Sequence, residues 1–199
     1  MNPEIFINAL AAYFVIVDPI GAALIFHSLT STYEKKQVMV VAARTIFISL
    51  TIVFLFGFYG EFILAKLGIT IEAIKVAGGL LLFYTAFRMI VKKDITDDII
   101  EEKDDISVYP MSIPLIAGPG CLTLTILLFS DAAGTEHLLS LILAIFIIFT
   151  LTLISFIFSN YLRTVIRKTG DDILKRLLGI ILAALSVQFI ADGIKQIAG

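Results

Sequence analysis

IFINALAAYFVIVDPIGAALIFH, residues 5–27, is the stretch that decides the fold class. Asp18 is the only Asp, Glu, Lys or Arg within it. The stretch is longer than the roughly 20 apolar residues that a helix needs to cross the hydrocarbon core of a bilayer. Because lipid offers no hydrogen bonds to the backbone, we expect this segment to cross the membrane as a helix.

The rest of the chain repeats this pattern five times, in residues 38–65, 71–91, 108–130, 137–162 and 172–196. Charged residues make up 16% of the chain and mean hydropathy is +1.00. A soluble domain would carry roughly 25% charged residues. We therefore predict an all-α, polytopic membrane protein with six transmembrane helices in a single transmembrane domain, residues 1–199. The net charge of −2 leaves no basic surface for nucleic acid, so the lipid bilayer is the expected partner.

The distribution of Lys and Arg predicts the orientation. Twelve of the fifteen lie in or beside the links after the first, third and fifth segments, and three lie on the other face. Since cytoplasmic links carry the excess of basic residues, the first face should be cytoplasmic and both termini should lie outside. The acidic stretch 93–107 then becomes a cytoplasmic linker of a multi-pass protein in the cytoplasmic (inner) membrane.

Two motifs recur at a spacing of about 100 residues. Residues 18–21 (DPIG) correspond to residues 118–121 (GPGC), and residues 75–78 (KVAG) correspond to residues 176–179 (RLLG) with a shift of one. A repeat of three spans must enter the membrane from the opposite side, because three is odd. Residues 1–92 and 108–199 are thus predicted to be inverted repeats, which are typical of secondary transporters. A duplication that serves folding alone is the alternative.

Prolines lie near the middle of the first and fourth predicted spans. Pro19 and Pro119 each remove a backbone donor and clash with the preceding turn, so we expect both helices to be broken there. Gly21, Gly118 and Gly120 loosen the backbone further. Each break should create a new helix start near the middle of the bilayer, with the proline at its first position.

The two new helix starts predict a binding site. A helix start presents unpaired amides and a partial positive charge, which together attract anions. Asp18 can cap its own helix, whereas Gly118 has no side chain to do so. We expect a ligand carboxylate near Gly120, Cys121 and Leu122. The predicted substrate-binding residues are Asp18, Pro19, Gly21, Gly118, Pro119, Gly120, Cys121, Leu122 and Thr123.

The role of Asp18 has two interpretations. A charge deep in the bilayer is costly and usually functional, so Asp18 could hold a substrate ammonium, a cation or a proton. In the alternative it is only a helix cap. Thr123 would add a hydroxyl to the ligand site.

Motifs of catalysis are absent from the sequence. It has no Walker A loop, HExxH or GxSxG, so we expect no enzyme and no catalytic residues. His27 and His137 lie on different links without neighbouring ligands, which argues against a metal site. No cofactor is expected apart from a coupling ion, H⁺ or Na⁺.

Five motifs resemble those of the MarC family over essentially the whole chain. They are residues 18–21 (DPIG), 25–30 (IFHSLT), 77–83 (AGGLLLF), 113–120 (IPLIAGPG), and 187–189 (VQF) with Gly193. The resemblance implies a relative of small neutral amino acid transporters, within the group of LysE-type exporters. It also implies glycine or alanine as substrate, with proton or sodium coupling. Ala22 and Leu24 depart from the family pattern, in which polar Asn and then Pro often follow the first motif.

These observations favour a secondary transporter of a small neutral amino acid. The substrate carboxylate would lie on the amides after Pro119, and Asp18 would hold the ammonium or the coupling ion. A channel or exporter for another small solute and a non-transporting scaffold or regulatory protein are the alternatives. The sequence leaves open whether copies of the chain form a homo-oligomer.

Overall fold

A computed structural model describes residues 2–91 and 105–198, apart from the side chains of residues 88, 89, 163–172, 174 and 175. Every element in these ranges is a helix, and the prediction of an all-α chain is confirmed for them. In order the elements are α1 (Pro3–Val17), α2 (Pro19–Leu29), α3 (Lys35–Lys66), α4 (Ile71–Val91), η2 (Ser107–Ile116), α5 (Pro119–Ser130), α6 (Thr135–Ile157) and α7 (Ser159–Ala198).

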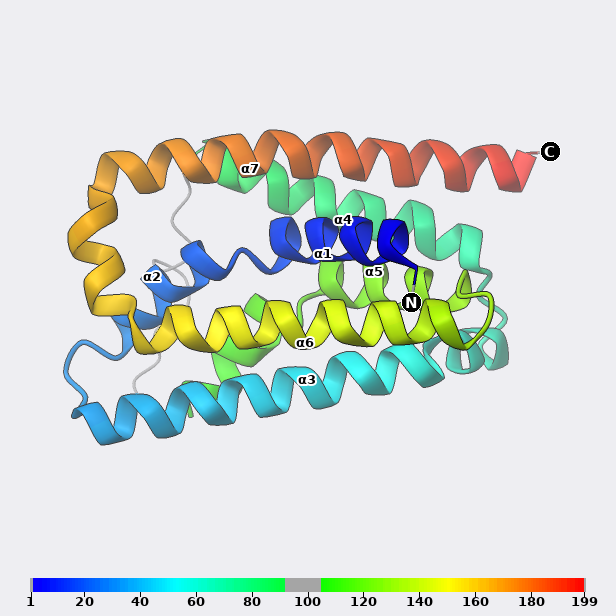
Figure 1. The fold of residues 1–199 in the computed structure, drawn as a ribbon. Helices are drawn as coiled ribbons and strands as arrows, with labels where there is room; N and C mark the ends of the chain where they lie inside the picture. The colour runs from blue at the N-terminus through cyan, green and yellow to red at the C-terminus, as the bar shows by residue number, and fades with distance from the viewer. Residues whose placement is uncertain (1, 92–104, 199) are drawn as a thin grey trace.

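The helices lie in three layers (Figure 1). The short segments α1, α2, η2 and α5 form the middle layer. On one side α3 and α6 contact each other and this layer, and on the other side α4 packs along α7. Both ends of the chain lie toward the same end of the bundle (Figure 1). The broken segments therefore lie between two layers of longer helices (Figure 1).

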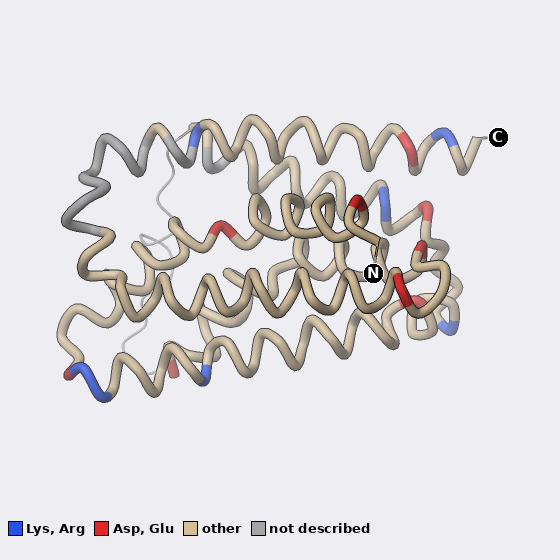
Figure 2. Tube along the Cα trace, in the orientation of Figure 1, with Lys and Arg blue, Asp and Glu red and all other residues tan. Residues whose placement is uncertain are grey.

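Four segments of the described chain are long and apolar enough to cross a membrane. They are Pro3–Leu29, Lys35–Lys66, Thr135–Ile157 and Arg176–Ala198, and the bent pair η2 and α5 makes a fifth if it is counted as one span. The charges of the described residues gather toward the two ends of the helices (Figure 2). Large apolar side chains such as Phe47 and Phe62 are exposed on the outer faces, as expected of helices that face lipid.

The predicted breaks of the first and fourth spans are confirmed. The first span breaks at Asp18, between α1 and α2. The fourth bends by 56° between η2 and α5, at Ala117 and Gly118. Its first half, however, is not a regular α-helix. Tyr109 and Ile113 leave helical backbone geometry because each precedes a proline, and η2 is a kinked π-helical segment.

The acidic linker 93–107 falls mostly outside the described residues, and only its last three residues can be placed. Asp105 forms an ion pair with Arg44 of α3 and accepts hydrogen bonds from the hydroxyl and amide of Ser107. The Ser107 hydroxyl bond, with help from the Ser107 amide and the charge of Arg44, lowers the pKa of Asp105 below its ordinary value. Ser107 already belongs to η2, so the linker ends one residue earlier than predicted.

Candidate functional site

Asp18 is the hinge of the first span. Its backbone is left-handed, with φ 45° and ψ 69°, a conformation that Asp tolerates better than most residues. Its N–H donates to Phe14 O at the end of α1, and its Oδ1 accepts from the Gly21 amide at 3.0 Å. The prediction that Asp18 caps its own helix is therefore confirmed. Asp18 is half-buried.

Gly21 is fitted to this cap. A Cβ at Gly21 would lie 2.1 Å from Asp18 Oδ2 and 2.8 Å from its Cγ. Any side chain there would push the carboxylate away from the amide that it caps. The DPIG motif thus encodes one local structure, in which the acid caps the helix, the proline occupies its first position and the glycine leaves room for the carboxylate.

Gly118 begins the second helix start, α5, without any side-chain cap. The carbonyl oxygen of Pro114 lies 2.2 Å from the position that a Cβ of Gly118 would take. Only glycine allows this approach of the two backbone segments. This close contact therefore requires glycine at position 118, and glycine has no side chain that could cap α5.

The amides at the start of α5 differ in their partners. Leu122 N donates to Gly118 O at 3.0 Å, so the prediction that the Leu122 amide stays open is wrong: the first helical hydrogen bond already uses it. The amides of Gly120 and Cys121 have no hydrogen-bond acceptor within residues 2–91 and 105–198. The start of α5 thus offers two amides rather than three.

Side chains from two other helices cover this helix start. Leu82 of α4 and Ile16 of α1 lie over Gly120, with Leu82 Cδ2 2.3 Å and Ile16 Cγ2 3.9 Å from the position of an added Cβ. Ile16 precedes Asp18 by two residues, so the two breaks lie near each other in space. Thr123 lies one turn after Gly120 on the same face of α5, against Gly78 of α4. Cys121 is buried.

Tyr13 is a site residue that sequence reasoning missed. It is completely buried in α1, and its hydroxyl donates to Thr125 Oγ1 at 2.9 Å. Thr125 in turn donates to Cys121 O at 2.7 Å, in the first turn of α5. This chain joins α1 to α5 next to both breaks. The available signal was a tyrosine inside an apolar run, because a buried phenol requires a hydrogen-bond partner.

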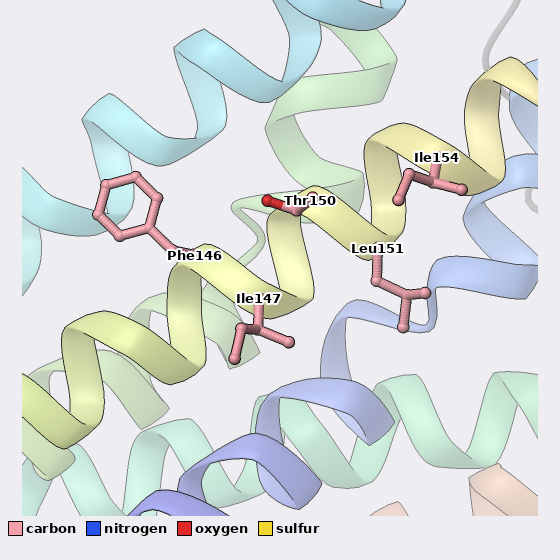
Figure 3. Close-up of a pocket in the computed structure, with 5 residues that line it drawn as sticks. All are labelled: Phe146, Ile147, Thr150, Leu151 and Ile154. Carbon is pink, nitrogen blue, oxygen red and sulfur yellow. The ribbon is translucent and has the colours of Figure 1, made fainter. Parts of the chain in front are cut away.

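A groove of about 320 Å³ on α6 is not part of this site. Its lining residues are Phe146, Ile147, Thr150, Leu151 and Ile154, all from one helix (Figure 3). Phe146 and Ile154 are nearly half exposed, so the groove belongs to the apolar outer surface. Among the residues that can be placed, no group of three His, Cys, Asp or Glu side chains could hold a metal.

Apolar outer faces, charges toward the helix ends (Figure 2) and several helices long and apolar enough to cross a bilayer define a polytopic α-helical integral membrane protein. Within that class, the chain belongs to the MarC family, because residues 3–198 match the family of MarC integral membrane proteins.

Relatives of this chain align with it over most of their length. The chain is 34% identical to UPF0056 membrane protein MJ1677 of Methanocaldococcus jannaschii, over 98% of each chain. It is 36% identical to UPF0056 membrane protein MJ0972 of the same organism, over 95% of this chain and 86% of that one. It is 30% identical to UPF0056 membrane protein YvbG of Bacillus subtilis, over 95% and 93%. No solved structure matches.

Proposed function

We propose that the protein is a secondary transporter of a small neutral amino acid such as glycine or alanine. The observation that carries the proposal is the pair of neighbouring helix starts, one capped by the Asp18 carboxylate and one left without a side-chain cap at Gly118. The substrate carboxylate would lie on the amides of Gly120 and Cys121, where the helix start favours negative charge. Asp18 would attract the substrate ammonium or a coupling ion, H⁺ or Na⁺.

The size of the substrate follows from what covers Gly120. The side chains of Leu82 and Ile16 pack against this residue and leave little space beside it. A ligand that reaches the Gly120 amide must therefore carry a small side chain. Thr123 lies one turn further along the same face of α5, and in this proposal its hydroxyl also contacts the ligand. A hydrogen atom or methyl group in place of a long side chain fits this setting best.

We further propose that residues 1–92 and 108–199 form two inverted halves of three spans each, with α4 as the third span. Equivalent helices begin 100 residues apart, at Pro19 and Pro119 and again at Lys35 and Thr135. Their contacts are reciprocal: α1 contacts α6 as η2 contacts α3, and α2 contacts α6 and α7 as α5 contacts α3 and α4. Two halves that pack in this exchanged manner can rock about a shared site, which is the alternating access of secondary transporters.

In this proposal the protein lies in the cytoplasmic membrane, with both termini outside. The Lys and Arg count supports this orientation.

The test is amino acid uptake into proteoliposomes under an imposed proton or sodium gradient. Asp18→Asn removes the charge but keeps a side chain that caps helices equally well. We expect uptake to lose its dependence on the ion gradient while the protein stays folded. Asp131→Asn, an exposed acid at the end of α5, is the matched control and should behave as wild type.

Three results would contradict the proposal. Unchanged affinity and ion dependence in Asp18→Asn would show that the carboxylate is only a cap. Flux without any coupling would instead indicate a channel, and no flux with any small amino acid would exclude this substrate class.

A further inference from the structure

A second cavity, of about 480 Å³, lies at the end of the bundle where α2 leads into α3 and α6 meets α7. Lys35 and His27 line it from the first half of the chain, and Ser159 and Asn160 line it from the second. It lies apart from the two breaks, and neither the family match nor the proposed transport site assigns it a role.

The depth of this cavity places it among lipid headgroups. α3 has 32 residues and is therefore about 48 Å long at 1.5 Å per residue. The hydrocarbon core is only about 30 Å thick, so the ends of α3 extend beyond it. Lys35 is the first residue of α3. This end is also the one that the Lys and Arg count predicts to be cytoplasmic, the leaflet whose anionic lipids attract basic residues.

The lining combines positive charge with apolar surface. The described lining residues include one lysine and one histidine but no Asp or Glu, so the cavity favours an anion. Its apolar side is formed partly by Met39 and Ile157, whose exposed fractions are 58% and 44%. Tyr33, an amphipathic side chain of the kind found at membrane interfaces, also lines the cavity. A charged region beside exposed apolar side chains matches an amphiphile better than a free inorganic anion.

We propose that this cavity binds the phosphate headgroup of an anionic phospholipid. Lys35 holds the phosphate, and the upper part of an acyl chain lies along Met39 and Ile157. Because both halves of the chain line the cavity, a bound lipid bridges them at this face. The proposal does not depend on the identity of the transported solute.

Native mass spectrometry of the whole protein, released from nanodiscs of mixed phosphatidylcholine and phosphatidylglycerol, tests the proposal. We expect wild type to retain phosphatidylglycerol in preference to phosphatidylcholine. Lys35→Gln should bind phosphatidylglycerol about fivefold more weakly, the effect of one basic residue near an anionic headgroup. Lys35→Arg should retain it. Lys36→Gln is the matched control, because Lys36 is the neighbouring exposed lysine and is not among the lining residues.

Equal loss of phosphatidylglycerol in Lys35→Gln and Lys36→Gln would overturn the proposal, because it would reflect general surface charge. A second measurement uses thermal stability in detergent. Phosphatidylglycerol should stabilise wild type and Lys36→Gln more than Lys35→Gln, and millimolar inorganic phosphate should not reproduce this difference. If phosphate alone did so, the site would be one for a free anion and the lipid assignment would be wrong.

Discussion

Substituting Asp18 in three ways separates its three roles: hinge conformation, helix cap and charge. Asp18→Ala removes the cap on the Gly21 amide, which costs about 1 kcal/mol. It also places a Cβ without a compensating side-chain hydrogen bond in a left-handed conformation at φ 45°, at a further cost of about 1–2 kcal/mol. We therefore expect Asp18→Ala to lose about 2–3 kcal/mol of stability.

The other two substitutions isolate the parts of this loss. Asp18→Gly adopts the left-handed conformation freely and, as a helix cap, costs only about a few tenths of a kcal/mol. Asp18→Asn keeps both the cap and the conformation, so its stability should stay about that of wild type. All three variants lack the charge. The expected order of stability is wild type and Asn together, then Gly, then Ala.

Thermal unfolding of the purified protein in one detergent measures this order. At about 2–4 °C per kcal/mol for a chain of this size, Asp18→Ala should unfold about 4–12 °C below wild type. Uptake assays on the two most stable variants, Asn and Gly, then report on the charge, because their stability should differ by only about a few tenths of a kcal/mol. If Asp18→Ala were as stable as Asp18→Gly, the left-handed hinge would carry no strain and this account of the break would be wrong.

Three further predictions follow from contacts around the breaks and the linker. In a double-mutant cycle of Tyr13→Phe and Thr125→Val, thermal unfolding should give a coupling of about 0.6 kcal/mol, the average for hydrogen bonds between membrane helices, and at most about 1.7 kcal/mol. Additive losses would contradict the bond from Tyr13 to Thr125. Gly118→Ala should destabilise by about 1–3 kcal/mol, because its methyl group meets Pro114 O at 2.2 Å, and wild-type stability would refute the tight bend. Because the pKa of Asp105 is lower in the folded protein, its stabilising contribution should be present at neutral pH and lost as pH falls below about 4 and through the folded pKa. Asp105→Asn should lessen the fall in unfolding temperature at acid pH, by a small amount because the ion pair is exposed. The same fall in the variant and in wild type would contradict this role of Asp105.

The breaks were predictable because proline acts through local geometry. Pro19 cannot donate an amide, and Asp18 is among the residues that accept the left-handed hinge, so four adjacent residues determine the first break. The second break was equally visible at Pro119. The apolar length of the segments predicted the helices for the same reason, since backbone hydrogen bonding in lipid permits little else.

Features that depend on packing between distant segments were not predictable in this way. The open amide expected at Leu122 is a different case, because its bond to Gly118 O is the ordinary first bond of a helix that begins at Pro119 and depends on no distant segment. The bond from Tyr13 to Thr125 joins residues 112 positions apart. The kinked form of η2 had a local signal in Pro110 and Pro114, but two prolines do not determine which backbone path a segment takes between neighbouring helices.

The difference between the two helix starts is the strongest argument for a zwitterionic ligand. A symmetric duplication would have given both starts the same cap, and therefore two sites of the same charge character. Here the acid stands at one start only, and at the other the Pro114 carbonyl leaves no room for any side chain. In the proposed site a negative carboxylate thus lies near a positive helix start. An α-amino acid carries the two complementary charges on adjacent atoms, and a simple cation or anion would use only half of this arrangement.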